Sequence, residues 1–301
     1  MKRLKALLRI AGCYRDSRIV SAADFAGEYD RIVNTYHVWN ETILPSPEAV
    51  LRFDLLPEKS GLKIIDLACG TGHITTRLLS NLIRKGHTDF SVTGIDMAEE
   101  LISHCRKVHT DSRLTFIREE GTAFLRSLPS ASIDALYCGW AIPYFDRKTL
   151  LPLFRRVVRP GGLIGLISNA RGTLRHVERA FVEVMLENPD SFHKVMDISS
   201  HLPRGISGLN RLMAAQGFCT LDSGKKEVEL QFGSPGFLFN WLTDCGAIAG
   251  TRSIFRDPGE MKAKIIAKIG QYNGRKGPDG REYVINHRYV YGVYRRGKGE
   301  E

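Results

Sequence analysis

Short apolar runs alternate with longer polar and amphipathic stretches through the middle of the chain. The apolar, largely β-branched runs cover residues 63–66, 91–96, 114–117, 133–137 and 163–167. Each run has the length of a buried strand. Strands that alternate with helices form a parallel sheet, because each right-handed crossover returns the chain to the same edge. The pattern therefore predicts an α/β fold with a mostly parallel sheet.

Two further strand candidates lie in the last third of the chain. Residues 218–222 or residues 228–232 are expected to form one of them, and residues 283–294, rich in tyrosine and valine, the other. Residues 273–280 precede the second candidate and contain glycine, proline, asparagine and aspartate, which is typical of a loop. We expect these two strands to complete the sheet.

The first strand ends in an acid followed by a glycine-rich turn. Asp66 closes the apolar run, and Gly70 and Gly72 precede the next helical segment. Glycines let the backbone pass close to a ligand, and the start of the helix presents unpaired N–H groups beside it. Asp96 ends the second strand in the same way, at a position where a carboxylate can hold the hydroxyls of a ribose. The two strand ends predict a nucleoside site.

The details of the turn argue against a dinucleotide. The third glycine of the dinucleotide fingerprint is replaced by Thr75, and the negative charge of Asp66 would repel a phosphate. For the glycine turn alone, an ordinary strand-to-helix connection is the alternative interpretation. The order of acid, three residues, Gly70, one residue and Gly72 resembles the first motif of the class I S-adenosylmethionine-dependent methyltransferases.

Later motifs carry the same resemblance in the same order. Glu119 and Glu120 follow the third strand, and the turn 160–162, Pro-Gly-Gly, precedes the fifth. The resemblance implies a Rossmann-like, seven-stranded and mostly parallel sheet with an antiparallel last strand and helices on both faces. It also implies helical insertions on the acceptor side, which we expect at about 171–203 and 234–271.

The resemblance implies S-adenosylmethionine as the cofactor. In this family the first-motif glycines approach its methionyl and ribose parts, Asp66 helps to hold its amino end, and Asp96 binds the ribose hydroxyls. The adenine amino group is expected at Glu120, with Glu119 as the rival. The segment around Tyr29 resembles one that covers the cofactor in many small-molecule methyltransferases. The expected cofactor-binding residues are Tyr29, Asp66, Ala68, Gly70, Thr71, Gly72, Asp96, Met97, Glu120, Gly121 and Cys138.

The residues after the fourth strand are expected to face the transferred methyl group. Residues 138–145 lack the Asn/Asp-Pro-Pro-aromatic motif of amino methylation, and no cysteine there follows a proline as in C5-cytosine methylation. Trp140 and Tyr144 are expected either to line an apolar acceptor pocket or simply to pack in the core. No universal catalytic residue is expected, because the sulfonium methyl is already electrophilic and displacement mainly needs positioning.

A weaker resemblance concerns the acceptor. Residues 237–250 and 280–294 resemble the malonyl-carrier-protein and aconitate-type carboxyl methyltransferases. A carboxylate acceptor needs a cation to position it. The candidates are Arg171, Arg175, Arg204 and Arg252, and for each of them a solvated surface charge is the alternative. We expect residues 1–55 to form an N-terminal helical cap and residues 56–301 the methyltransferase domain.

The charge of the chain is +10, from 43 lysines and arginines against 33 acids. Much of it lies in residues 1–20, where Leu4, Leu7 and Leu8 recur at helical spacing among basic residues. Such a helix can pack on the domain, lie on a membrane surface or serve as a targeting peptide, and we favour packing. The six cysteines lack metal-ligand spacing, so no metal site and a reducing, cytoplasmic location are expected.

These observations favour a methyltransferase that modifies an oxygen or carbon of a small molecule, with a carboxylate as the favoured acceptor. Three alternatives stay open. They are methylation of a lipophilic, quinone-like precursor at a membrane surface, methylation of RNA or protein, and cofactor binding without turnover. No nucleic-acid module is recognisable, so no nucleic-acid partner is expected. The sequence determines neither the acceptor nor the oligomeric state.

Overall fold

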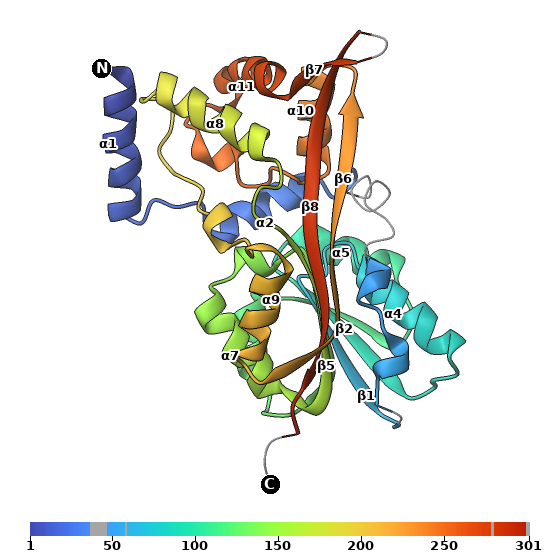
Figure 1. The fold of residues 1–301 in the computed structure, drawn as a ribbon. Coiled ribbons are helices and arrows are strands. Elements are labelled where there is room, and N and C mark those ends of the chain that lie inside the picture. Colours follow the sequence, from blue (N-terminus) through green and yellow to red (C-terminus); the bar gives the residue numbers. More distant parts are fainter. Residues whose placement is uncertain (37–46, 58, 278–279, 299–301) are drawn as a thin grey trace. The chain divides into compact units, whose positions relative to one another are not determined.

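The computed structural model describes residues 1–36, 47–57, 59–277 and 280–298. Contacts between backbone positions divide the chain into two compact units, each assembled from separate stretches. Unit 1 consists of Met1–Trp39, Gly172–Ile198 and Glu227–Arg288. Unit 2 consists of Asn40–Arg171, Ser199–Lys226 and Tyr289–Glu301. Figure 1 shows the elements of both units along the chain.

Unit 2 contains the five strands expected from the apolar runs. They are β1 (Leu62–Leu67), β2 (Phe90–Asp96), β3 (Leu114–Arg118), β4 (Ile133–Gly139) and β5 (Val158–Asn169). They are parallel and lie in the order β3-β2-β1-β4-β5, so the carboxyl ends of β1 and β2 are neighbours. The predicted parallel sheet is confirmed.

Two long strands extend the sheet in the order β5-β8-β6. They are β6 (Phe218–Phe232) and β8 (Gly280–Arg296), and both contribute residues to each unit. β8 runs antiparallel to β5, with Leu163 opposite Arg295. The seven strands of this path confirm the predicted Rossmann-like sheet with an antiparallel strand. The two alternatives for the penultimate strand, 218–222 and 228–232, are parts of the same strand.

An eighth strand corrects one expectation. The loop predicted at 273–280 contains β7 (Gly274–Gly277), which pairs antiparallel with the start of β8 as a hairpin. Turn-forming residues join a strand here because the neighbouring strand supplies partners for their backbone groups. Residues 278–279 of the expected loop lie outside the described residues.

Helices cover both faces of the sheet in unit 2. They are α4 (His73–Arg84), α5 (Glu99–Val108), α6 (Gly121–Ser127), α7 (Arg147–Val157) and α9 (Gly205–Ala214). One apolar cluster joins Leu67 of β1 to Leu125 of α6, Phe154 of α7 and Met213 of α9. A smaller cluster under α5 includes Ile102 and Phe116, and Figure 1 shows α5 and α9 on opposite sides of the strands.

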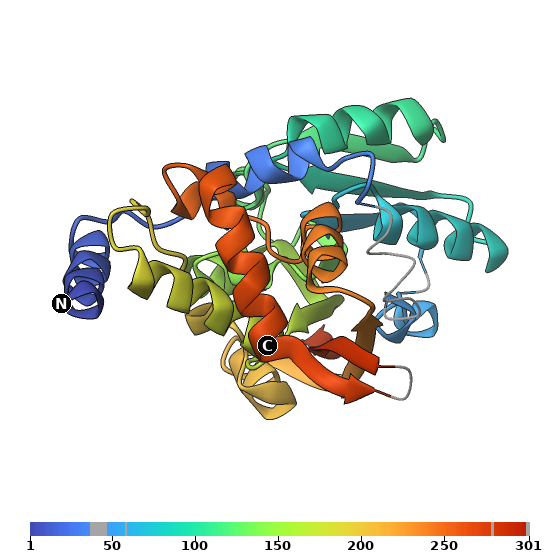
Figure 2. The same cartoon turned by 90° about the horizontal axis from the view of Figure 1, so that it is seen from above.

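Unit 1 is mostly helical. It contains α1 (Lys2–Arg15), α2 (Ala22–Arg31), α8 (Arg175–Glu187), α10 (Pro235–Asp244), the short helix η5 (Arg252–Ile254) and α11 (Pro258–Asn273). α8 and α11 lie against each other, as Figure 2 also shows. The insertions expected at 171–203 and 234–271 supply most of these helices. The predicted cap 1–55 includes residues 37–46, outside the described residues, and its boundary stays a prediction.

Helix α1 lies against α8 and buries its small residues. Ala6 and Cys13 are buried, and Arg3 pairs with Glu183 of α8 at 2.9 Å. The leucines that suggest an apolar face point to solvent, and Leu8 is 67% exposed. The helix therefore lies on unit 1 as expected, but through the face opposite to the one that its leucines indicate. In the described ranges, none of the helices has both the length and the apolar character needed to cross a membrane.

Candidate cofactor site

The turn after β1 has a backbone that few residue types can adopt. Ala68, Gly70 and Gly72 have φ values of 56°, 56° and 79°, all in the left-handed region. A Cβ atom on Gly72 would lie 3.2 Å from the Phe116 ring, so both conformation and space favour glycine there. Ala68 carries the strain of this conformation despite its Cβ, which is common at functional sites. Within the turn, the N–H groups of Gly70 and Gly72 already donate hydrogen bonds, to Asp96 and to the carbonyl oxygen of Cys69.

The carboxylate of Asp96 fixes this turn. Its Oδ2 accepts a hydrogen bond from the backbone N–H of Gly70 at 2.9 Å, and its Oδ1 accepts one from the N–H of Ala98, also at 2.9 Å. The two strand ends that predict a nucleoside site are therefore in direct contact. Each carboxylate oxygen has two lone pairs, so Asp96 keeps acceptor capacity for the hydroxyls of a ribose.

Asp66 presents a buried acceptor. It is 1% exposed, and its Oδ2 accepts a hydrogen bond from the Thr75 hydroxyl at 2.6 Å. Among the described residues, its buried Oδ1 has no hydrogen-bond partner. Burial, together with the negative charge of Asp96, raises the pKa of Asp66 to about 7 despite the hydrogen bonds from Thr75. An acceptor oxygen of this kind suits a cationic donor such as an ammonium group.

Thr75 is a residue whose role the sequence did not reveal. In the sequence it stands out only because it replaces the third glycine of a dinucleotide fingerprint. In the structure it lies in the first turn of α4, is fully buried and holds the Asp66 side chain. The sequence signal that could have indicated this contact is a polar residue in the first turn of the helix that follows the acid-glycine turn.

Glu120 acts as the N-cap of α6. Its carboxylate accepts hydrogen bonds from the N–H groups of Thr122 at 3.0 Å and Ala123 at 2.8 Å, and from the Thr122 hydroxyl. Burial raises the pKa of Glu120, but these hydrogen bonds outweigh it and lower the pKa overall. Its predicted contact with the adenine amino group stays a prediction, as does the rival role of Glu119.

The other expected cofactor residues of unit 2 lie at or just beyond the carboxyl ends of the strands β1 to β4. Met97 follows Asp96 and is half-buried, and the carbonyl oxygen of Thr71 lies 3.2 Å from Nε2 of His109. A Cβ on Gly121 would lie 2.9 Å from Cδ1 of Leu67. Cys138 is fully buried in β4, where burial raises the pKa of its thiol and favours its neutral form.

Tyr29 lies in unit 1, on α2. A Cβ on Gly246 would lie 2.7 Å from Cε1 of its ring, and the ring meets that of Tyr36 edge-on with centroids 5.6 Å apart. The glycine at position 246 is therefore the residue that leaves room for this tyrosine. The predicted position of Tyr29 over the methionyl end of a cofactor stays a prediction.

The aromatic residues after β4 have different surroundings. Trp140 has a φ of 57°, its backbone N–H donates to the carbonyl oxygen of Ile167 at 2.7 Å, and its ring centroid lies 6.3 Å from that of Tyr289. A tryptophan in the left-handed region is uncommon and suggests a constrained position. Tyr144 is half-buried and packs against the core cluster. Both candidate roles, acceptor lining and core packing, remain open for the pair.

The four candidate arginines do not form one cluster. Arg171 and Arg204 are exposed in unit 2, where the backbone N–H of Arg171 donates to the carbonyl oxygen of Pro203 at 3.1 Å. Arg175 is exposed at the start of α8 in unit 1, where it lines a shallow hollow beside the β7–β8 hairpin. Arg252, also in unit 1, lines a different and larger cavity together with other charged residues.

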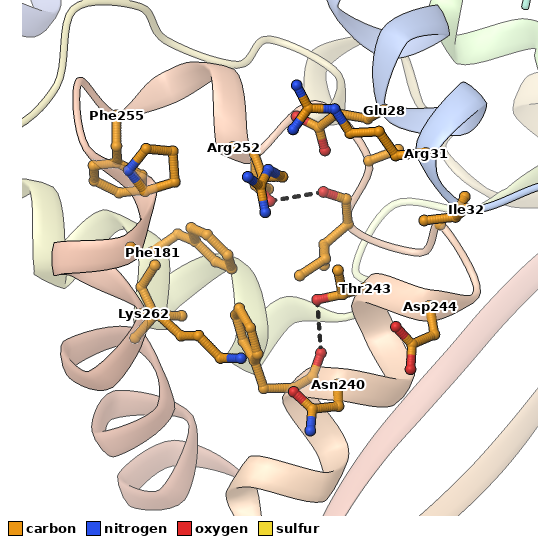
Figure 3. A pocket seen from close by; sticks show the side chains of 18 residues that line it. Glu28, Arg31, Ile32, Phe181, Asn240, Thr243, Asp244, Arg252, Phe255 and Lys262 are labelled. Atoms are coloured by element: carbon orange, nitrogen blue, oxygen red, sulfur yellow. Dashed lines mark hydrogen bonds between the residues drawn. The ribbon is translucent and has the colours of Figure 1, made fainter. Parts of the chain in front are cut away.

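That cavity has a volume of about 370 Å³ and lies within unit 1 (Figure 3). The residues that line it come from α2, α8, α10, η5 and α11 and from the loops beside them. Its apolar wall includes Phe181, Phe239 and Ile265. Arg31 and Lys262 join Arg252 as its basic residues, and no local pattern in the sequence points to either.

Comparisons with known proteins agree with this geometry. Residues 64–162 match a family model described as a methyltransferase domain. A malonyl-[acyl-carrier protein] O-methyltransferase from Pectobacterium atrosepticum is 29% identical over 52% of this chain and 54% of its own length. A demethylmenaquinone methyltransferase from Lactococcus lactis is 28% identical over 40% of this chain and 48% of its own. The chain therefore spans about half the length of the curated relatives it matches.

A solved structure shows the same fold. The phosphoethanolamine N-methyltransferase 2 of Haemonchus contortus, in complex with phosphomonomethylethanolamine and S-adenosylhomocysteine, is similar with a TM-score of 0.52 and 15% identity. The similarity covers 89% of this chain and 57% of that one. The matched family segment contains the acid-glycine turn, the acid that ends β2 and the strands that carry them. Residues 64–162 thus match a methyltransferase domain, and the relatives that resemble this part of the chain are methyltransferases.

Proposed function

We propose that the chain transfers a methyl group from S-adenosylmethionine to an oxygen or carbon of a small molecule, and that a carboxylate is the favoured acceptor. The observation that carries the cofactor assignment is the contact of Asp96 with Gly70 beside the buried, unpartnered Oδ1 of Asp66. Asp66 would accept the ammonium group of the cofactor, and Asp96 would accept its ribose hydroxyls. Glu120 or Glu119 would face the adenine amino group.

The chemistry leaves the protein mainly with binding and positioning. S-adenosylmethionine supplies a methyl group that is already electrophilic because it is bonded to a sulfonium. The chain has to hold the acceptor in line with that methyl group and to exclude water. A carboxylate is ionised at neutral pH and is itself the nucleophile, so this reaction needs no general base. It does need a cation that orients the acceptor without bonding to the reacting lone pair.

Two observations support an anionic acceptor. The Pectobacterium relative is named as an O-methyltransferase of a malonyl carrier protein. In unit 1, Arg31, Arg252 and Lys262 line one cavity with an apolar wall, which suits a small acceptor better than a nucleic acid.

A second candidate is a quinone-like acceptor at a membrane surface. The Lactococcus relative is named as a demethylmenaquinone methyltransferase. Leu4, Leu7 and Leu8 of α1 are exposed near basic residues, which is typical of a helix that lies on a bilayer. We rank this candidate second because Arg3 and Lys5 already pair with acids of unit 1.

Formation of S-adenosylhomocysteine by the purified protein tests the proposal. The acceptor panel contains carboxylic acids and their matched amides, a demethylated quinol in anionic vesicles, and total RNA. We expect turnover with a carboxylic acid and none with its amide, with a methyl ester as the product. Turnover with the quinol or RNA alone would overturn the acceptor assignment. Cofactor binding without turnover on fractionated metabolites would indicate a non-catalytic protein.

A further inference from the structure

The cavity in unit 1 combines a buried apolar wall with a basic opening (Figure 3). Phe181 and Phe255 are buried side by side with their ring centroids 6.4 Å apart, and Ile265 of α11 is also buried. At about 370 Å³ the cavity falls in the range of about 300–1,000 Å³ that is usual for small-molecule sites. Its wall would accept a hydrocarbon chain or a ring.

The basic side chains at the opening differ from neighbouring lysines in their ion pairing. In the described part of the chain, Arg31, Arg252 and Lys262 form no ion pair, and Nζ of Lys262 lies 5.5 Å from the centre of the Phe239 ring. In contrast, Lys264 and Lys268 of the same helix, α11, are paired with Glu260 and Glu187. On α11, the two lysines that do not line the cavity are therefore paired with acids. Lys262, which lines the cavity, forms no ion pair with the described residues.

The two acids that line the cavity do not cancel this charge. Glu28 accepts hydrogen bonds from the backbone N–H groups of Gly250, Arg252 and Ser253, so it holds the loop that leads into η5. Burial raises the pKa of Glu28, although these hydrogen bonds and the positive charge of Arg252 act in the opposite direction. Asp244 is exposed beside Thr243, on the side of the cavity away from Lys262 in Figure 3. With three basic and two acidic side chains, the lining carries a net positive charge and therefore favours an anion.

We propose that this cavity is a binding site for a carboxylate with an apolar body. The apolar body would occupy the wall formed by Phe181, Phe255 and Ile265. The carboxylate would lie at the opening, where Arg252 can form a bidentate pair and Lys262 adds a point charge. Binding of such an anion is independent of the proposed function and can be measured without turnover.

Calorimetry with octanoate and octanol, which share a chain and differ in charge, tests the binding. We expect octanoate to bind at least tenfold more tightly than octanol, with an affinity that falls as salt rises. Octyl phosphate distinguishes a carboxylate site from a general anion site, and tighter binding of octyl phosphate would overturn the choice of carboxylate. Equal binding of octanol and octanoate would overturn the role of the basic opening.

Three variants test the residues. Lys262→Met keeps the apolar stem and removes the charge, so it should weaken octanoate binding about tenfold. Lys264→Met is the matched control on the same helix and should bind like the wild type. Lys262→Glu should lose octanoate and gain octylammonium, a result that a misfolded protein could not give. Equal effects of the Lys262→Met and Lys264→Met substitutions would contradict the proposed site.

The same variants separate this inference from the proposed function. If octanoate binds as expected but no acid in the panel is methylated, the function fails and the binding site stands. If a carboxylic acid is methylated but octanoate binds wild type and Lys262→Met equally, the function stands and the proposed binding site fails.

Discussion

The backbone N–H of Gly70 donates a hydrogen bond of 2.9 Å to Oδ2 of Asp96, so the acid that ends β2 holds the turn that follows β1. One side chain thereby shapes the glycine turn. Because Asp96 is also predicted to bind the ribose, a change at this residue should act on both the turn and cofactor binding.

Replacement of Asp96 by alanine should weaken S-adenosylmethionine binding by about 1.5–3 kcal/mol, because charge-assisted hydrogen bonds to the ribose are lost. Calorimetry measures the affinity, and thermal unfolding measures the loss of the contact with Gly70. Asp89→Ala is the control, since Asp89 precedes β2 at its other end and is exposed. Unchanged affinity in Asp96→Ala would contradict the ribose assignment.

Gly70→Val should abolish cofactor binding, because a branched side chain would fill the space beside the turn. The φ of 56° adds a strain of about 1–2 kcal/mol for any residue with a Cβ. Gly86→Val is the matched control, since Gly86 has a φ of 82° and a Cβ added there would have no other atom within 4 Å. Both variants should lose stability, and only Gly70→Val should lose binding. Normal binding by Gly70→Val would show that the site lies at another turn.

Asp66 should make stability fall as pH rises. Its pKa in the folded chain is about 7, above its ordinary value of 3.8, so between these values the folded state binds more protons than the unfolded state. The free energy of unfolding should therefore decrease from about pH 4 to pH 7 through this group and level off above. Asp66→Asn removes this contribution, and denaturant titrations at pH 5 and pH 8 should show a smaller decrease than in the wild type. An identical pH dependence in both proteins would refute the raised pKa.

Cofactor affinity should respond to pH in the opposite direction. An ammonium group binds the ionised form of Asp66 better than the neutral form, so affinity for S-adenosylmethionine should rise between pH 6 and pH 8. Calorimetry across this range checks the trend, and Asp66→Asn should flatten it. A pH-dependent affinity of equal slope in that variant would assign the effect to another group.

Asp134 should contribute to the stability of the fold and not to cofactor binding. It is fully buried near the start of β4, where it pairs with Arg159 at 2.8 Å and Lys59 at 3.1 Å and accepts the N–H of Lys63 at 2.8 Å. Asp134→Ala would leave the N–H of Lys63 and the two partly exposed cations without their acceptor and should lower the free energy of unfolding by about 1–3 kcal/mol. The remaining folded protein should bind the cofactor with unchanged affinity. A selective loss of affinity would place Asp134 in the binding site.

Helix α1 should contribute stability through Ala6. Ala6→Phe would overpack its contact with α8 and should destabilise the protein by about 1–3 kcal/mol. Leu8→Ser is the control on the same helix and should change stability by less than about 0.5 kcal/mol, because Leu8 is exposed. Deletion of residues 1–20 should lower the melting temperature, while vesicle binding stays negligible in both forms. Salt-sensitive co-sedimentation of the full chain with anionic vesicles, lost on deletion, would instead favour the membrane interpretation and the quinone-like acceptor.

The sequence alone determined the features that depend on neighbouring residues. The apolar runs identified the five parallel strands because burial on both faces of a sheet requires continuous hydrophobic residues. Gly70 and Gly72 marked the turn because few other residues adopt a positive φ without strain. Asp66 and Asp96 stood out because each follows an apolar run directly, and a strand end fixes where such a side chain can lie.

Only the tertiary structure decided which side chains meet. Gly70 and Asp96 are far apart in sequence, and their contact depends on the parallel pairing of β1 and β2. The cavity in unit 1 is assembled from α2, α8, α10, η5 and α11, so no local pattern could reveal that Lys262 lines it. Helix α1 presents Ala6 rather than its leucines to α8, because the face that is buried depends on the shape and charge of the partner surface. The periodicity of apolar residues identifies the faces of a helix, and tertiary packing determines which face is buried.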